Sequence, residues 1–387
     1  MNTYKRLPVT FTRGEGARLW DTQDKEYLDA LSGIAVTNLG HAHPAVSKAI
    51  CDQANRLIHT SNIYTVAAQE RLGDALTELA GMDRVFFGNS GAEANEAAIK
   101  LARLYGHRKG VKSPAIVVME NSFHGRTLAT LTATGNRKVQ AGFEPLVQGF
   151  VRVPYGDLAA LHAVAEHQPD VVAVLVEPIQ GEGGINVPPA DYLPAVRELC
   201  DGKGWLMMLD EIQTGMARTG RAFAYQHYAL RPDVMTVAKA LGNGVPIGAC
   251  LARGEAAELF APGNHGSTFG GNPLACSAAL TVCDTIREQR LWERAATLGG
   301  RIMDGLRAAL SEVPGVLEVR GQGLMIGIAL DRPCAELVAI ALDDGLLINV
   351  TAESVIRLLP PLVMTEQQAD TLVRKLGSMV RAFLASH

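Results

Sequence analysis

Short apolar runs alternate with helix-like stretches through the middle of the chain. Runs of this length, bounded by polar turns, are typical of buried strands in a parallel sheet, and the stretches between them are typical of crossover helices. The predicted strands lie at 84–88, 116–119, 151–154, 171–176, 206–209, 234–238 and 248–251. This order predicts an α/β fold around a mainly parallel central sheet.

The two ends of the chain follow other patterns. Apolar runs at 17–20 and 27–31 flank a polar turn, which predicts a β-hairpin. Amphipathic helices are predicted after Pro44 and over 67–79. Beyond about residue 285 the pattern becomes α+β, with long helices and short strands between them. These elements are predicted at 291–310, 316–321, 324–330, 346–350 and 366–383.

The patterns divide the chain into three segments. The N-terminal segment, 1–40, would belong to a small α+β domain, 41–284 would form a large ligand-binding domain, and 285–387 would complete the small domain. We expect the N-terminal hairpin to pack with the C-terminal part. No proline, glycine or serine-rich linker separates the segments, and no internal repeat is found in the sequence.

Composition narrows the range of partners. Hydrophobic residues make up 48% and charged residues 20% of the 387 residues, which is typical of a soluble globular protein with a substantial core. A net charge of −4 argues against broad electrostatic binding to nucleic acid or an anionic membrane, so small molecules are the expected partners. The N-terminus has no apolar signal core, and we expect a cytoplasmic protein.

Cysteines and histidines give little support for a metal or disulfide framework. The six cysteines lack C-x-x-C spacing, and we expect them to be buried thiols in a reducing compartment. They are Cys51, Cys200, Cys250, Cys276, Cys283 and Cys334. His41 and His43 stand in a loop, and with His59 and His124 elsewhere in the chain they lack a fixed third ligand, so no metal is expected.

Candidate chemistry appears where two predicted strands end. The run at 206–209 is followed by Asp210, and the run at 234–238 is followed by Lys239. Neighbouring strand ends in an open α/β sheet face the same crevice, so we expect the carboxylate and the amine to meet there. Pyridoxal 5′-phosphate (PLP) needs such a pair, because its aldehyde takes an amine as a Schiff base and its ring nitrogen stays protonated beside a carboxylate.

A possible phosphate site follows the strand at 84–88. Ser90 and Glu93 have capping-box spacing, which predicts a helix start with free amides at Gly91 and Ala92. Helix N-termini bind anions through such amides and the helix dipole. The alternative is a well-capped helix without a ligand.

Further candidates occupy two loops. Phe123 could stack on a flat heterocycle and Arg126 could bind a carboxylate, although most exposed residues of these types do neither. The hydroxyls of Ser267 and Thr268 could bind phosphate or substrate, or could cap the helix predicted from Pro273.

Six motifs in register resemble the class III PLP-dependent aminotransferases from end to end. They read NSGAEANE, FHGRT, EPIQGEGG, LDEIQTGMARTG, AKALGNG and HGSTFGGNPLAC. Within that class, GIAVTNLGHAHP and HTSN are most similar to the acetylornithine aminotransferases. The resemblance implies the fold type I of PLP-dependent transferases, with 41–284 as the PLP-binding domain.

The resemblance also implies roles for the cofactor site. Lys239 would hold the cofactor covalently and would shuttle a proton once the substrate displaces it. The remaining contacts would be Asp210 to the ring nitrogen, Gln213 to the phenolic oxygen, Phe123 to the ring face, and the amides of Gly91 and Ala92 to the phosphate. Thr268 would complete the phosphate site from the other subunit of a homodimer with a shared active site.

Two arginines would sort the substrates. By resemblance, Arg126 takes the α-carboxylate of N2-acetyl-L-ornithine or the distal carboxylate of glutamate, with Ser267 near the same substrate. Arg357 would take the α-carboxylate of glutamate and would pair with Glu182 when that carboxylate is absent. A planar guanidinium matches a carboxylate with two hydrogen bonds. Without the resemblance, Arg357 would be read as a strand-end ion pair and Glu182 as an acidic turn residue.

The implied reaction transfers the δ-amino group of N2-acetyl-L-ornithine to 2-oxoglutarate, giving N-acetyl-L-glutamate 5-semialdehyde and L-glutamate, a step of arginine biosynthesis. The alternatives are N-succinylornithine, N-succinyl-diaminopimelate, ornithine or 4-aminobutyrate as donors, or a non-catalytic binding protein on the same fold.

The sequence departs from the family pattern at two places: Ala92 replaces a common threonine, and GNGVP replaces GGGFP. The apolar residues around Ile34, where ornithine aminotransferases usually carry a tyrosine, favour an acylated nitrogen.

Overall fold

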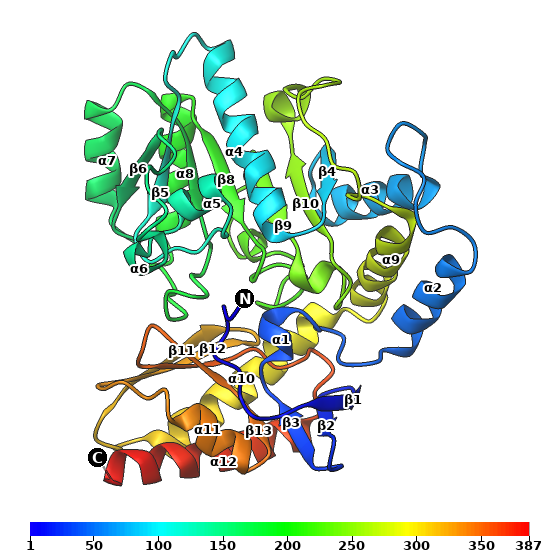
Figure 1. The fold of residues 1–387 in the computed structure, drawn as a ribbon. Helices are drawn as coiled ribbons and strands as arrows, with labels where there is room; N and C mark the ends of the chain where they lie inside the picture. The colour runs from blue at the N-terminus through cyan, green and yellow to red at the C-terminus, as the bar shows by residue number, and fades with distance from the viewer. Residues whose placement is uncertain (387) are drawn as a thin grey trace.

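The computed structural model describes residues 1–386 and is built around a seven-stranded central sheet (Figure 1). Its strands lie in the order β4 (Arg84–Gly88), β10 (Gly248–Ala252), β9 (Val234–Val237), β8 (Leu206–Asp210), β7 (Val171–Val176), β5 (Ala115–Met119) and β6 (Phe150–Val153). The strands from β9 to β6 are parallel. Every central strand that the sequence predicted is present, and the mainly parallel α/β sheet is confirmed.

β10 is antiparallel to both of its neighbours, β9 and β4. A parallel crossover needs about a dozen residues or more, usually with a helix. The connection from β9 to β10 contains only a 3₁₀ turn, Lys239–Leu241, and therefore reverses the chain direction. The short connection places Lys239 at the edge of the sheet where the parallel strands end.

Helices cover both faces of the central sheet. Alternate residues of β8 point to opposite sides: Met207 and Leu209 join the cluster that contains α8, whereas Leu206 and Met208 join the cluster that contains α4. α2 and α3 pack against α9 beside β4. These helices are α2 (Pro44–Ala54), α3 (Ala67–Ala80), α4 (Gly91–Arg108), α5 (Leu128–Ala133), α6 (Arg137–Gln140), α7 (Leu158–His167), α8 (Tyr192–Lys203) and α9 (Pro273–Glu288).

Both termini build the smaller part of the molecule, where blue and orange-red segments lie together in Figure 1. One sheet has the order β1 (Phe11–Glu15), β2 (Arg18–Asp21), β3 (Glu26–Asp29) and β13 (Leu346–Leu347). The other has the order β11 (Val316–Gln322), β12 (Met325–Leu330), β15 (Val355–Leu358) and β14 (Asn349–Thr351). Around them pack α10 (Leu291–Leu310), α11 (Leu337–Asp343) and α12 (Glu366–Ser386).

The predicted hairpin is confirmed as β2 and β3, and its contact with the C-terminal part is the parallel pairing of β3 with β13. The run at 346–350 was predicted as one strand, but Ile348 separates two short strands that belong to different sheets. The domain boundaries at residues 40 and 284 stay predictions.

One cysteine differs from the expectation of buried thiols. Cys51 is exposed, because α2 fully buries only Val46 and leaves Cys51 outside the core, whereas the other five cysteines are buried. Within residues 1–386 we find no cluster of three or more histidine, cysteine, aspartate or glutamate side chains able to hold a metal ion. No helix in that range has the length and apolarity needed to cross a bilayer.

A left-handed turn, α1 (Ser32–Ala35), joins β3 to the central part of the molecule. The φ angles of Ser32, Gly33, Ile34 and Ala35 lie between 52° and 70°. Left-handed backbone costs roughly 1–2 kcal/mol for each non-glycine residue, so the surroundings must hold this turn in place. The hydroxyl of Ser32 donates to the carbonyl of Leu359 at 2.7 Å, which ties the turn to the segment after β15.

Candidate active site

A cavity of about 400 Å³ opens at the edge where the parallel strands end. Loops that follow β4, β5, β7, β8 and β9 line it, as expected for an α/β sheet. Its lining includes Ser90, Gly91, Ala92, Phe123, Arg126, Glu177, Asp210, Gln213 and Lys239, with Val36 from beyond the left-handed turn. The predicted meeting of Asp210 and Lys239 in one crevice is confirmed.

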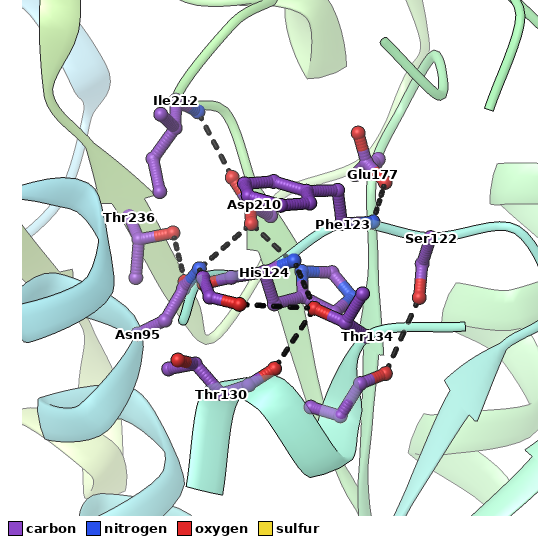
Figure 2. Close-up of polar contacts among 12 residues, drawn as sticks. Asn95, Ser122, Phe123, His124, Thr130, Thr134, Glu177, Asp210, Ile212 and Thr236 are labelled. Atoms are coloured by element: carbon purple, nitrogen blue, oxygen red, sulfur yellow. Dashed lines mark hydrogen bonds and ion pairs between the residues drawn. The ribbon is translucent and has the colours of Figure 1, made fainter. Parts of the chain in front are cut away.

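Asp210 is held by hydrogen-bond donors (Figure 2). Asn95 Nδ2 donates to Asp210 Oδ2 at 2.8 Å, and the amide of Ile212 donates to Oδ1 at 3.1 Å. His124 Nδ1 lies 2.8 Å from Oδ2, and because a carboxylate only accepts, this nitrogen carries the proton in the pair. Thr236 orients Asn95 by donating to its Oδ1 at 2.7 Å. The surroundings therefore suit an ionised carboxylate.

Asn95 and His124 were missed as members of this site. His124 was considered only as a metal ligand, and Asn95 received no role. A signal for Asn95 was present: it is a polar residue on the buried, alanine-rich face of α4, where an unpaired amide would be costly.

Lys239 reaches the cavity from a strained position. Its φ of 46° lies in the left-handed region, directly after β9. Burial is the main cause that lowers the pKa of its amine to about 8; Glu182 opposes this shift, and Arg357 adds to it. An amine with this pKa is about half neutral near pH 8 and largely neutral about one pH unit higher, and only the neutral form is a nucleophile or base.

This pKa predicts the pH dependence of covalent modification at Lys239. The rate at which the ligand-free protein attaches PLP should rise about tenfold per pH unit below pH 8 and level off above it, because protonation removes the nucleophile. Borohydride trapping followed by peptide mass spectrometry would measure the rate. A rate that keeps rising above pH 8 toward the ordinary lysine value of 10.5, or one that is already level far below pH 8, would contradict it.

The start of α4 forms one end of the cavity. The Ser90 hydroxyl accepts from the amide of Glu93 at 3.2 Å, as predicted, but the Glu93 carboxylate accepts from the amide of Asn89 rather than Ser90. The first amides of a helix have no partner within it. A Cβ on Gly91 would lie 2.7 Å from Ile212 Cδ1, so a larger residue there would displace the Ile212 side chain.

Phe123 and Arg126 lie together on another wall. The Arg126 guanidinium is 5.6 Å from the centre of the Phe123 ring, and Arg126 is exposed. The backbone amide of Phe123 donates to Glu177 Oε1 at 2.9 Å (Figure 2). The loop after β5 therefore presents an aromatic face and a cation to the same cavity.

Arg357 is fully buried and pairs with Glu182. Its Nη1 donates to Glu182 Oε1 at 2.6 Å, and its Nε donates to Asn349 Oδ1 at 3.1 Å. Gln213 Nε2 approaches the same Glu182 oxygen at 3.3 Å. Nη2 of Arg357 is buried without a partner, which leaves one prong of the guanidinium fork open.

Ser267 and Thr268 do not line this cavity. Ser267 accepts at its Oγ from the amide of Gly270 at 2.9 Å, and Thr268 is exposed on a separate hollow beside Glu93. The alternative that they cap α9 is wrong, since the Asn272 side chain accepts from the amide of Ala275 as the cap of that helix. Ser267 Oγ also accepts from Asn89 Nδ2 at 3.3 Å, next to the start of α4, but neither hydroxyl lines the main cavity.

Glu177 is a third site residue without a predicted role. It directly follows β7, much as Asp210 ends β8, and it is 5% exposed. Burial is the main cause that raises its pKa to about 7; His124 opposes the rise, and Asp210 adds to it. The same strand-end signal that identified Asp210 was present at Glu177.

Comparisons with known proteins agree with this geometry. Residues 1–380 match the family model of class-III aminotransferases. The acetylornithine aminotransferase of Nitrosomonas europaea is 59% identical over 386 residues, covering 100% of this chain and 98% of that protein. A structure of the Toxoplasma gondii ornithine aminotransferase, with PLP at partial occupancy in its active site, has a TM-score of 0.94 and 37% identity, covering 98% of this chain and 93% of that one. For the acetylornithine aminotransferase of Elizabethkingia anophelis the TM-score is 0.88 with 36% identity, covering 98% and 95%.

Proposed function

The chain belongs to the class-III aminotransferase family, and from this premise we propose that it transfers the δ-amino group of N2-acetyl-L-ornithine to 2-oxoglutarate. The products would be N-acetyl-L-glutamate 5-semialdehyde and L-glutamate, as in arginine biosynthesis. The observation that carries the proposal is that Lys239, Asp210 and Arg126 line one cavity, and that the buried Arg357–Glu182 pair adjoins it through Gln213.

The family depends on PLP, and the donor set of the cavity fits it. The free amides of Gly91 and Ala92 suit the phosphate at one end, and Asp210 suits a protonated ring nitrogen. Gln213 and Phe123 would contact the phenolic oxygen and the ring face. When bound, PLP supplies a ring that accepts electrons from the substrate carbon. Gln213 Oε1 is buried without a partner, so this amide has hydrogen-bonding capacity left for a ligand.

Lys239 would act twice through one atom. Its neutral Nζ attaches the cofactor, and once released it accepts the proton from the carbon that bears the substrate amine. The lowered pKa supports both roles, because the amine does not need strong base to lose its proton. Asn95 and His124 would hold the Asp210 carboxylate in place beside the ring nitrogen.

The two arginines would distinguish the substrates. Arg126, exposed in the cavity, would bind the α-carboxylate of the acylated donor or the distal carboxylate of glutamate, with Ser267 near the same substrate. Arg357 would exchange Glu182 for the α-carboxylate of glutamate, using its open Nη2. N2-acetylornithine has no second carboxylate, so Glu182 would keep its partner during that half-reaction.

Replacing Arg357 with lysine should separate the half-reactions. We expect kcat/KM for glutamate to fall about 100-fold, because lysine cannot form two parallel bonds to a carboxylate, while kcat/KM for N2-acetylornithine changes little. Single-turnover kinetics would measure both. Arg320→Lys is the control: Arg320 holds the same loop through the carbonyls of Gly184 and Ile185. Equal losses in both half-reactions of Arg357→Lys would contradict the assignment.

A panel of amines tests the donor. N2-acetylornithine, N-succinylornithine, N-succinyl-diaminopimelate, ornithine and 4-aminobutyrate would be offered with 2-oxoglutarate under matched conditions. We expect the highest kcat/KM for N2-acetylornithine, because Val36 contributes an apolar wall and the chain has no tyrosine near Ile34 to meet a free α-amine. A higher value for another donor would replace this assignment, and no turnover at all would favour a binding protein.

We also propose a homodimer that shares its active sites. Thr268 would complete the phosphate site of the partner subunit. Large apolar side chains are exposed around it, namely Leu57, Ile58, Ile63, Tyr64 and Phe269. The Asn62 side chain ties their two segments by donating to the carbonyls of Ser267 and Gly270. Such a patch indicates an interface, and sedimentation analysis would reject the dimer if the protein were a monomer.

The proposed location is the cytoplasm, where the substrates of amino-acid biosynthesis would be available. All six cysteines are free and five of them are buried, which is compatible with a reducing compartment. Cell fractionation would test the location, and recovery of the protein outside the cytoplasm would reject it. Rescue of an arginine-requiring strain that lacks this step would test the pathway.

A further inference from the structure

Glu177 forms hydrogen bonds to two loops that carry residues of the proposed cofactor and substrate sites. Its Oε1 accepts from the amide of Phe123 at 2.9 Å, and its Oε2 accepts from the amide of Gly181 at 3.0 Å. Phe123 lies on the loop that ends in Arg126, and Gly181 directly precedes Glu182. One carboxylate therefore spans the ring-facing loop and the loop that holds the partner of Arg357 (Figure 2 shows the first of these bonds).

The second loop is closely packed around this joint. A Cβ on Gly181 would lie 2.3 Å from Gln213 Oε1, so the backbone of the loop lies directly against the amide that faces the cavity. The Thr351 hydroxyl holds the same loop from the small sheet by donating to the carbonyl of Glu182. A shift of Gly181 would thus move both Gln213 and Glu182.

We propose that Glu177 is a positioning residue that fixes the spacing between the Phe123 loop and the Gly181–Glu182 loop. This spacing sets the geometry of the cofactor ring site and of the site where Arg357 exchanges Glu182 for a substrate carboxylate. The inference rests on the proposed function, since it concerns the same cavity. Glu177 takes part in no chemical step and acts only through the two backbone amides that donate to it.

The ionised form of Glu177 is the one that can do this. A carboxylate accepts at both oxygens. In a protonated carboxyl one oxygen carries a hydroxyl donor, which would face an amide N–H donor, so that hydrogen bond could not form. The titratable groups around it are His124, Asp210, Lys239 and Tyr155. With the pKa of Glu177 raised to about 7 by burial, one of the two bonds would be lost as the pH falls through that value.

Glutamine imitates the protonated acid in shape and hydrogen-bonding capacity. Glu177→Gln should therefore behave at every pH like the natural protein below pH 7. Two dissociation constants would be measured across that pH: PLP from the ligand-free variant, and glutarate, an unreactive five-carbon dicarboxylate, from the PLP-loaded variant. At high pH we expect at least one of them to rise about tenfold, as the loss of one charge-assisted bond predicts, with convergence on the natural protein below pH 7.

Glu211 offers a matched control. It is buried, its pKa is also raised to about 7 by burial, and its two oxygens likewise accept backbone amides, those of Ala224 and Tyr225. It does not line the cavity. Glu211→Gln should leave both dissociation constants unchanged across the pH series.

Three outcomes would overturn the inference: unchanged constants in Glu177→Gln, a loss that does not depend on pH, or the same pH-dependent loss in Glu211→Gln. Thermal unfolding would be followed in parallel, and the two variants are expected to keep similar melting temperatures. N2-acetylornithine enters neither binding measurement, so a wrong donor assignment would leave this test intact.

Discussion

Replacing Lys239 by alanine should lower turnover by roughly 10⁴-fold and abolish covalent attachment of PLP. The reason is that the same Nζ serves as the attachment point and as the base for the proton on the substrate carbon. Steady-state kinetics with N2-acetylornithine and 2-oxoglutarate would measure the first effect. Absorbance and borohydride trapping would measure the second.

The Lys239→Ala variant should remain folded. In the native protein the pKa of the amine is lowered from 10.5 to about 8, so a protonated Lys239 destabilises the fold below pH 8, and this cost disappears only as the pH rises toward 10.5. Removing the amine should therefore not decrease the free energy of unfolding at neutral pH. Lys203→Ala, at the exposed end of α8, is the control and should leave turnover unchanged. Multiple turnovers at the normal rate in Lys239→Ala would refute the assignment.

Asp210→Asn should reduce kcat/KM on the order of 10³-fold in both half-reactions. The substitution removes the charge that would keep the cofactor ring nitrogen protonated. It also introduces an N–H donor into surroundings that already supply donors from Asn95, Ile212 and His124. We therefore expect weaker PLP binding together with slower chemistry, measured by dialysis and single-turnover kinetics.

Asp233→Asn is the matched control for this experiment. Asp233 accepts from the Met207 amide at 2.8 Å and from Arg197 at 2.7 Å, at the opposite end of the same strands. Its replacement should lower the stability of the protein. Any fall in PLP binding should then match the fall in the amount of folded protein. If Asp210→Asn and Asp233→Asn had the same kinetic effect, Asp210 would be structural rather than part of the active site.

Sequence patterns predicted the parts of the site that depend on strand order. Asp210 and Lys239 follow short apolar runs, and the parallel sheet brings these strand ends to one edge. Gly91 and Ala92 were predicted because a strand leads directly into a capped helix. Each of these patterns lies within a few residues of the chain, and the folded structure keeps the strand ends and the helix start that they predict.

Other contacts depend on loops that converge from distant parts of the chain. No periodicity indicates that His124 and Asn95 bind one carboxylate, or that Arg357 lies against Glu182, 175 residues away. Thr268 is a different case, because its proposed role needs a second copy of the chain. The two strands at 346–351 were merged because a mainly apolar run, interrupted only by Asn349, does not indicate the sheet to which each half belongs.

The left-handed turn at 32–35 has a consequence for engineering donor preference. Ile34 is β-branched, and side chains of this kind are rare at positive φ, so exchanges there would relax or redirect the main chain as well as reshape the wall next to Val36. A gain of activity toward free diamines after grafting an aromatic ring at this position would thus combine a new contact with a displaced loop. Selecting mutants along this stretch would therefore change the path of the main chain and the shape of the cavity wall together.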